Sequence, residues 1–285
     1  MILQKEITTI AQAKGVAKST IDKDWVLGHF LAAIYAIPEF RETLVFKGGT
    51  CLKKCYFPDY RFSEDLDFTS RRKDFELKQE HMELICTYLN EKVELRTHID
   101  SLRPLTFKNE LTGYEANIKF WGADHPRNEA PAPPERWQTR IKIEIILYEL
   151  MLFQEVEKKI IHTYSDSLSL DPNSIPCYAI EEVLAEKLRA LIQRSYTAPR
   201  DFYDIWFLQK NYQDLDFKKI VEAFHKKMKF KNLHFTGIDQ LINEKNDKKL
   251  RNSWNNSLAH QIPGDALPEF DLIKTELMEL FKKIF

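Results

Sequence analysis

Apolar residues recur at helical spacing towards the two ends of the chain, and strand-like patterns fill much of its first half. A period near 3.6 residues is typical of an amphipathic helix, and a period of two is typical of a strand with one buried face. The helical patterns cover residues 1–14, 19–38, 50–56, 74–90 and 182–285. The strand patterns cover residues 41–49, 61–69, 93–107, 114–121 and 136–147. This order predicts an α+β first part followed by an all-helical second part.

Two segments between these elements carry further signals. Ser19 precedes Asp22 by three residues, a spacing that resembles a helix N-cap. Residues 122–135 hold four prolines and few large apolar side chains, so this segment is predicted to be a long loop. Such a loop is either a functional binding loop or a decoration without a role.

The strand predicted over residues 61–69 has an acidic face. Ser63, Asp65 and Asp67 fall on one side of the strand, because side chains alternate at a period of two, and the apolar Phe62, Leu66 and Phe68 fall on the other. Two adjacent carboxylates repel each other unless a cation lies between them, and they can share a divalent metal ion. The pattern predicts a metal site, and a solvated strand face is the alternative.

A glycine turn precedes this strand. The apolar run 44–46 leads into Lys47-Gly48-Gly49-Thr50. Backbone N–H groups freed by such a turn can hold the phosphates of a nucleotide, although most glycine turns bind nothing. A phosphate-binding turn close to paired carboxylates is what metal-assisted phosphoryl or nucleotidyl transfer requires.

A second group of charged residues lies in the predicted helical part. Lys187 falls inside an apolar helical stripe, where it either extends along the core surface or directs a cation at an anion. The next helix is so apolar that Asp201 and Asp204, which share a face, need partners. Lys187 and Arg200 are the candidates. Because the stripe is apolar, Lys187→Met is expected to retain or raise stability.

The two motifs together resemble the AbiEii/AbiGii toxin family of the DNA polymerase β-like nucleotidyltransferase superfamily. The matching residues are Lys47-Gly48-Gly49-Thr50, Arg61-Phe62-Ser63-Glu64-Asp65-Leu66-Asp67-Phe68, Ala185-Glu186-Lys187 and Arg200-Asp201-Phe202-Tyr203-Asp204. The resemblance spans about residues 20–210. It implies a nucleotidyltransferase core over residues 1–170, with a mixed sheet and flanking helices, and a helical domain over residues 171–285.

The resemblance also implies an activity, the transfer of a nucleoside monophosphate from an NTP to an acceptor hydroxyl. The implied catalytic residues are Asp65, Asp67, Lys187 and Asp204. The implied nucleotide-binding residues are Lys47, Gly48, Gly49, Thr50, Ser63 and Lys187. The implied ligands for Mg²⁺, or Mn²⁺, are Asp65, Asp67 and Glu144. In this family the acceptor can be the 3′ end of tRNA, and the protein acts as a toxin, commonly with an antitoxin encoded alongside.

Charge and composition limit where RNA could bind. The formal net charge is -1, so the chain has no overall basic surface and an RNA contact needs a local patch. Residues 217–251 are rich in lysine with interleaved aromatic residues. The candidate RNA contacts there are Lys226, Lys227, Lys229 and Lys231. A solvated face of amphipathic helices is the alternative.

Other features point to a cytoplasmic protein. The sequence has neither a signal peptide nor an apolar run long enough to cross a membrane. Its four cysteines, Cys51, Cys55, Cys86 and Cys177, have neither disulfide-framework nor zinc-finger spacing and are expected to be reduced thiols. Two other functions stay open. One is a nucleotidylyltransferase or kinase acting on a protein or small-molecule hydroxyl, and the other is a nucleotide-binding regulator without turnover.

Overall fold

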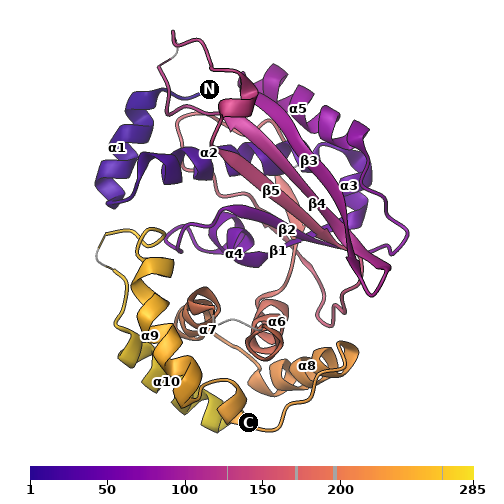
Figure 1. The fold of residues 1–285 in the computed structure, drawn as a ribbon, viewed down its shortest axis with the longest axis vertical. Coiled ribbons are helices and arrows are strands. Elements are labelled where there is room, and N and C mark those ends of the chain that lie inside the picture. Colours follow the sequence, from indigo (N-terminus) through magenta and orange to yellow (C-terminus); the bar gives the residue numbers. More distant parts are fainter. Residues whose placement is uncertain (127, 171–172, 195–197, 265) are drawn as a thin grey trace. The chain divides into compact units, whose positions relative to one another are not determined.

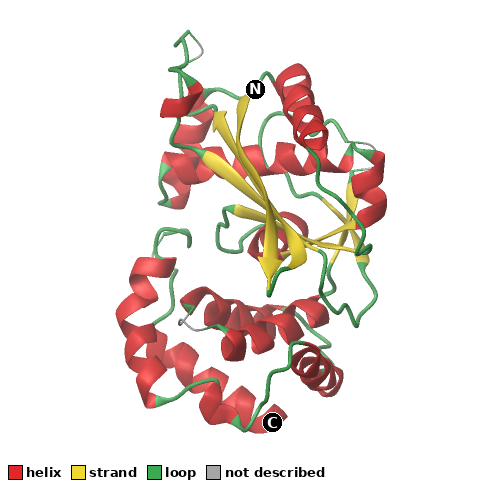
Figure 2. Ribbon diagram, turned by 45° about the vertical axis from the view of Figure 1, so that its right-hand side comes forward, coloured by secondary structure: helices red, strands yellow, loops and turns green. Residues whose placement is uncertain are grey.

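The chain forms two compact units. The computed structural model describes residues 1–126, 128–170, 173–194, 198–264 and 266–285. Unit 1 comprises Met1–Glu149 and Glu155–Cys177, and unit 2 comprises Leu150–Gln154 and Tyr178–Phe285. The described part of unit 1 contains the sheet and that of unit 2 contains helices, so the predicted α+β class with a helical second part is confirmed (Figure 2).

Unit 1 is built on one mixed sheet (Figure 1). Its strands are β1 (Leu44–Lys47), β2 (Asp65–Ser70), β3 (Arg96–Phe107), β4 (Glu110–Trp121), β5 (Arg140–Ile146), β6 (Val156–Lys159) and β7 (Ser174–Cys177). The strand order in the described residues is β3-β4-β5-β2-β1-β7-β6. The pairs β2–β5 and β1–β7 are parallel and the other pairs are antiparallel. The centre of the sheet is therefore the pair of strands that carries the two sequence motifs, β1 and β2.

Helices of unit 1 cover the sheet and complete its core. They are α1 (Gln4–Lys14), α2 (Lys18–Tyr35), α3 (Pro38–Thr43), α4 (Gly48–Cys51), the π-helix η1 (Leu52–Tyr56), α5 (Gln79–Val93) and the 3₁₀ turn η2 (Pro134–Arg136). Trp25 and Phe30 of α2 share one buried cluster with Leu66 and Phe68 of β2. Full burial of a side chain such as Phe68 stabilises the fold by about 2–3 kcal/mol, so the apolar side of β2 anchors the acidic side.

Several predicted boundaries were wrong at the level of single elements. The acidic strand begins at Asp65 rather than at residue 61, so Ser63 lies in the preceding loop. Ser19 does not cap α2, because the helix begins at Lys18 after Ala17, and Asp22 accepts a hydrogen bond from the backbone of Ala123 instead. Long-range contacts thus replaced the local capping interaction.

The sequence patterns did not predict three short elements. Helix α3 and strands β6 and β7 were not foreseen, because each has only four to six residues and too few apolar positions to show a period. The predicted boundary after residue 170 adjoins residues 171–172, which lie outside the described part. Beyond them β7 still belongs to unit 1, since it pairs with β1. Of the predicted loop 122–135, all but residue 127 is described, and only its last residues form η2.

Unit 2 consists of packed helices in its described part. They are α6 (Ile180–Gln193), α7 (Pro199–Asn211), α8 (Phe217–Phe230), the 3₁₀ turn η3 (Ile238–Gln240), α9 (Glu244–Leu258) and α10 (Phe270–Ile284). Helix α6 packs against α7 and α8, and α7 also packs against α9 and α10. No helix in the described residues is long and apolar enough to cross a membrane.

Candidate active site

Three carboxylates gather on one face of the central strands. Asp65 and Asp67 of β2 lie on the same side, opposite the buried Leu66. Strand β5 runs parallel to β2 in a register that pairs Asp67 with Glu144 and Asp65 with Lys142. The pattern of the sequence therefore predicted the acidic face correctly, and Glu144, the third metal ligand that the family resemblance implied, lies beside Asp67.

The ammonium group of Lys142 lies between two of these carboxylates. Its Nζ is 3.7 Å from Asp65 Oδ2 and 3.5 Å from Glu144 Oε2. The carboxylates raise the pKa of Lys142 against the opposing effect of its burial. A cation is therefore favoured at this point of the sheet, and Lys142 supplies a monovalent one.

Asp67 is the most perturbed member of this group. Burial, together with the nearby charges of Glu144 and Asp65, raises the pKa of Asp67 from 3.8 to about 6. Lys47, which faces Asp67 across the β1–β2 pair, partly offsets this rise. Crowded carboxylates with a raised pKa are suited to a divalent cation, which relieves their repulsion. The oxygen-rich donor set fits Mg²⁺ or Mn²⁺.

The glycine turn brings backbone close to the acidic face. Gly48 has a φ of +82°, and a Cβ at this position would lie 2.4 Å from Asp67 Oδ2. Only glycine combines this backbone conformation with this approach. Thr50 donates from its hydroxyl to the carbonyl of Asp65, which ties the turn to the start of β2. Helix α4 begins directly at Gly48, two residues earlier than predicted.

Gly49, the second glycine, lies against Arg61, a basic residue for which the sequence predicted no role. A Cβ on Gly49 would lie 2.9 Å from the guanidinium of Arg61 and 3.0 Å from Ser63 Oγ. Arg61 is buried, with 4% of its surface exposed. A buried guanidinium and a hydroxyl beside backbone N–H groups are suited to an anion. Ser63 therefore keeps its predicted proximity to the turn, although it lies outside the strand.

Lys187 is part of an ion-pair cluster in unit 2. Its Nζ is 2.6 Å from Asp204 Oδ2 and 3.1 Å from Asp201 Oδ1, and Asp204 is fully buried. Arg194 also pairs with Asp201, where the sequence had suggested Arg200. The interpretation of Lys187 as a cation directed at anions is correct. The prediction that Lys187→Met retains or raises stability started from a wrong premise. The lysine compensates buried charge, and its stem does not simply lie on an apolar surface.

One predicted RNA contact must be corrected. Lys227 is fully buried in α8, where its Nζ is 2.5 Å from Glu182 Oε1 and donates to the carbonyl of Leu150. It holds α8 against α6 and is inaccessible to an RNA phosphate. The lysine-rich sequence did not reveal that Lys227 faces inward. The helical period turns about one lysine in four towards the core. Lys226 and Lys229 are exposed and Lys231 is partly exposed.

Two further groups of potential metal ligands lie in unit 1. In each, the ligand atoms are within 4.8 Å of one another: Cys51, Cys55 and Cys177 in one group, and His29, His162 and Asp166 in the other. All four cysteines are free thiols, as predicted, and Cys177 is not isolated because β7 carries it to Cys51 and Cys55. Hydrogen bonds already connect His29 and His162 to Asp166, at 3.0 and 2.8 Å.

The comparison with protein families identifies the chain. The model of one family, described as nucleotidyl transferase AbiEii toxin of a type IV toxin–antitoxin system, matches residues 29–276. The chain belongs to this family. It is therefore a nucleotidyltransferase of the toxin class, and the type IV system implies an NTP substrate and a cognate antitoxin. The resemblance seen in the two sequence motifs is confirmed. No curated protein sequence matches the chain.

Solved structures show the same fold at low sequence identity. MenT4, a nucleotidyltransferase toxin from Mycobacterium tuberculosis H37Rv, matches with a TM-score of 0.67 and 17% identity, over 100% of this chain and 90% of that chain. A proposed nucleotidyltransferase from H. pylori matches with a TM-score of 0.54 and 14% identity, over 94% and 96%. JHP933 from Helicobacter pylori matches with a TM-score of 0.52 and 15% identity, over 94% and 93%. At these identities the likeness establishes the fold.

Proposed function

We propose that this AbiEii-family toxin transfers a nucleoside monophosphate from an NTP to a hydroxyl of RNA, in a reaction that depends on Mg²⁺. The observation that carries the proposal is the carboxylate group of Asp65, Asp67 and Glu144 beside the Gly48-Gly49 turn. It combines a raised pKa at Asp67 with a cation held between the carboxylates. NTP and RNA substrates are consistent with action in the cytoplasm.

Residues of unit 1 would bind the metal and the nucleotide. Asp65, Asp67 and Glu144 would hold Mg²⁺ in place of the Lys142 ammonium. When bound there, the ion would polarise phosphate oxygens and lower the pKa of the attacking hydroxyl. The backbone N–H groups that begin the helical run at Gly48 would bind the β- and γ-phosphates, with Arg61, Ser63 and Lys47 as further donors.

Residues of unit 2 would act on the leaving group. Lys187 would neutralise the charge that develops on the departing pyrophosphate. Asp204, 2.6 Å from Lys187 Nζ, would orient that ammonium group. Preorganised charge of this kind supplies the largest share of many enzymatic rate enhancements.

The acceptor can be tested directly by following the label. The protein is incubated with each α-³²P-labelled NTP, Mg²⁺ and total RNA, and the labelled product is treated separately with ribonuclease and protease. Label that only ribonuclease removes is expected, and a labelled band at tRNA length would identify the acceptor as tRNA. Label that only protease removes would contradict an RNA acceptor. Replacing Mg²⁺ with EDTA is expected to abolish labelling.

The exposed lysines of α8 provide a second test. Lys226→Glu with Lys229→Glu is expected to weaken RNA labelling about tenfold, because two phosphate contacts are replaced by repulsion, and to leave NTP binding unchanged. The affinity of the wild type for RNA should fall steeply with salt. Lys227 is excluded from this variant, since a glutamate there would face Glu182 in the core.

A matched control comes from the last helix. Lys282 and Lys283 are also exposed and adjacent to the end of a helix in unit 2. Reversing both to glutamate changes the net charge equally and is expected to leave RNA labelling unchanged. Equal loss in both variants would show that the general charge of unit 2, and not α8, controls RNA binding.

A further inference from the structure

A cavity of about 220 Å³ lies within unit 1. It is lined by residues of α1, α2, the π-helix η1 and the segments around Asp59 and Thr163. The charged residues that line it are Lys14, Lys53, Lys54, Asp24 and Asp59. Lys53 and Lys54 belong to η1. π-helical turns are rare in proteins, but those that occur often lie at functional sites.

The three lysines give this cavity an excess of positive charge. Lys54 and Asp24 neutralise each other, with Nζ and Oδ2 2.6 Å apart and both side chains buried. Lys53 is also buried, donates to the carbonyl of Pro58 and lies over the ring of Phe62. Burial lowers the pKa of Lys53 to about 8, and the charges of Lys54 and Lys14 add to this effect although those of Asp24 and Asp59 oppose it. An anion near Lys53 and Lys14 would relieve this repulsion.

Asp24 offers a second, different contact. Its Oδ2 accepts hydrogen bonds from Lys54 and from the hydroxyl of Tyr164 at 2.7 Å. Its Oδ1 is buried and has no hydrogen-bond partner among the described residues. A buried carboxylate oxygen without a partner destabilises the fold, so this atom favours a ligand that carries a hydrogen-bond donor.

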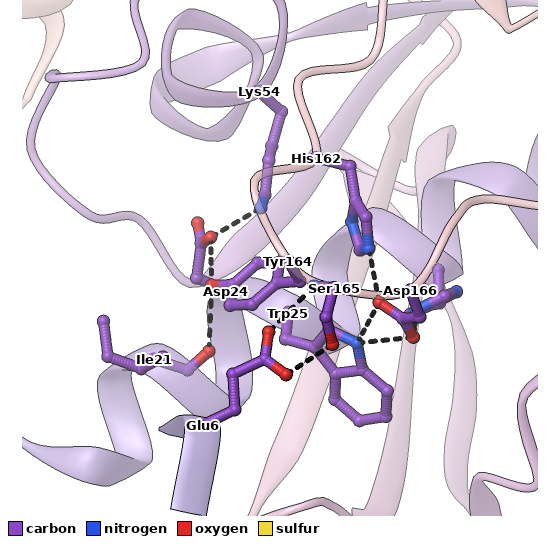
Figure 3. Close-up of polar contacts among 10 residues, drawn as sticks. Glu6, Ile21, Asp24, Trp25, Lys54, His162, Tyr164, Ser165 and Asp166 are labelled. Carbon is purple, nitrogen blue, oxygen red and sulfur yellow. Dashed lines mark hydrogen bonds and ion pairs between the residues drawn. The ribbon is translucent and has the colours of Figure 1, made fainter. Parts of the chain in front are cut away.

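A network of polar contacts joins one wall of the cavity to α1 and α2 (Figure 3). The hydroxyl of Tyr164 also donates to the carbonyl of Ile21, and Ser165 donates to Glu6 of α1. Asp166 bonds to Trp25 and His29, which joins the segment to α2. It also bonds to His162 of its own segment. This network connects α1, α2 and the Thr163 segment, so Asp24 and Lys54 are preorganised in the wall of the cavity.

We propose that this cavity binds one phosphorylated ribose of an RNA strand, with the phosphate at Lys53 and Lys14 and a ribose hydroxyl donating to Oδ1 of Asp24. Lysine ammonium groups bind phosphate, and a hydroxyl is the donor that a sugar adds beside it. The volume is below the roughly 300–1,000 Å³ of pockets that enclose whole small molecules, so one sugar and its phosphate enter and the rest of the strand stays outside. Phe62 lines the cavity three residues before Asp65, so a strand held here would lie near the start of β2. The inference rests on the proposed RNA acceptor.

Binding without turnover tests this site. A fluorescein-labelled single-stranded RNA oligonucleotide and a DNA oligonucleotide of the same sequence are titrated with protein in EDTA without NTP, and anisotropy is measured. Wild type is expected to prefer RNA. Lys53→Met and Lys14→Met are each expected to lower RNA affinity about tenfold, since each removes a charged contact. Asp24→Asn is expected to reduce the preference for RNA over DNA, because it weakens the acceptor of the ribose hydroxyl.

The controls separate this site from folding, from free nucleotides and from catalysis. Lys5→Met removes an exposed lysine of the same helix as Lys14 and should leave binding unchanged. Lys14 is only partly buried, so Lys14→Met still tests the site if Lys53→Met fails to fold. Equal RNA affinity of Lys14→Met and Lys5→Met, or equal wild-type binding of RNA and DNA, would overturn the inference. Complete displacement of the RNA oligonucleotide by free ribose 5-phosphate would instead assign the cavity to a small sugar phosphate.

Failure of the inference can be told apart from failure of the proposed function. If NTP labels RNA in the wild type while Lys14→Met and Lys5→Met bind RNA equally, the function stands and the cavity has no part in it. If the variants lose RNA binding as expected but no NTP labels RNA, the cavity binds RNA and the proposed transfer reaction is wrong.

Discussion

Asp67→Asn is expected to abolish nucleotidyl transfer and to raise the stability of the fold at neutral pH. Loss of one carboxylate from the proposed metal site should lower kcat/KM by about 10³-fold or more. The free energy of unfolding should rise by about 1–2 kcal/mol at pH 7, because the variant removes a charge that is crowded by Glu144 and Asp65. An isosteric amide keeps the packing of β2 beside the turn.

The pH dependence gives this prediction a definite sign. The pKa of Asp67 is about 6 in the folded protein and 3.8 is its ordinary value. The native state therefore binds this proton more tightly than the unfolded state, and the wild type loses stability as the pH rises from about 4 through 6. Asp67→Asn should not show this loss. Its advantage in melting temperature should be absent below about pH 4 and fully developed by about pH 7.

Metal binding provides an independent measurement on the same variant. Mg²⁺ should raise the melting temperature of the wild type and relieve its loss of stability above pH 6, but should have little effect on Asp67→Asn. Asp74→Asn is the matched control, since Asp74 is exposed and pairs with Arg72 in the loop after β2. Full activity of Asp67→Asn would remove Asp67 from the reaction. An equal response of both proteins to Mg²⁺ would place the ion elsewhere.

Lys187→Met is expected to abolish transfer and, contrary to the expectation from its apolar stripe, to destabilise the protein. Removing the lysine takes away the cation that lies 2.6 Å from the fully buried Asp204, and also one partner of Asp201. Breaking a buried ion pair in this way costs about 3–5 kcal/mol. The free energy of unfolding, measured by urea denaturation, should fall by about this amount.

A double variant separates the two roles of Lys187. Lys187→Met combined with Asp204→Asn removes both charges of the Lys187–Asp204 pair and should regain most of the lost stability without regaining activity. Lys210→Met, an exposed position of α7 that pairs with Glu276, should change neither quantity measurably. If Lys187→Met is as stable as the wild type, the ion pair of Lys187 with Asp204 does not stabilise the fold. Retained turnover in Lys187→Met would exclude the lysine from catalysis.

The acidic strand shows how far local pattern could be trusted. Alternation of polar and apolar residues placed Asp65 and Asp67 on one face, because the side-chain period of a strand is two wherever it lies. The same pattern placed Ser63 on that strand, which was wrong, because the start of a strand is decided by its partners. Strand β5 pairs with β2 only from Asp65 onward.

The lysines show the opposite case. Lys187 and Lys227 both belong to helices whose composition left their roles open, and neighbouring residues in the sequence could not decide between a solvated and a buried position. In the structure Lys187 faces Asp204, and Lys227 faces Glu182 of another helix. The cost of an unpaired buried charge requires such partners, but the sequence does not reveal which elements supply them.

The sequence by itself determined the α+β class, the acidic face, the glycine turn and the family, because each depends on residues that are near one another in the chain and on a local period or turn geometry. Only the tertiary structure decided that Lys142 lies between Asp65 and Glu144, that Arg61 lies against Gly49 and that three lysines line a cavity with Asp24. These groups come from separate elements. Their proximity, and hence their charge state, follows from strand register and helix packing, which depend on the free energy of the whole fold.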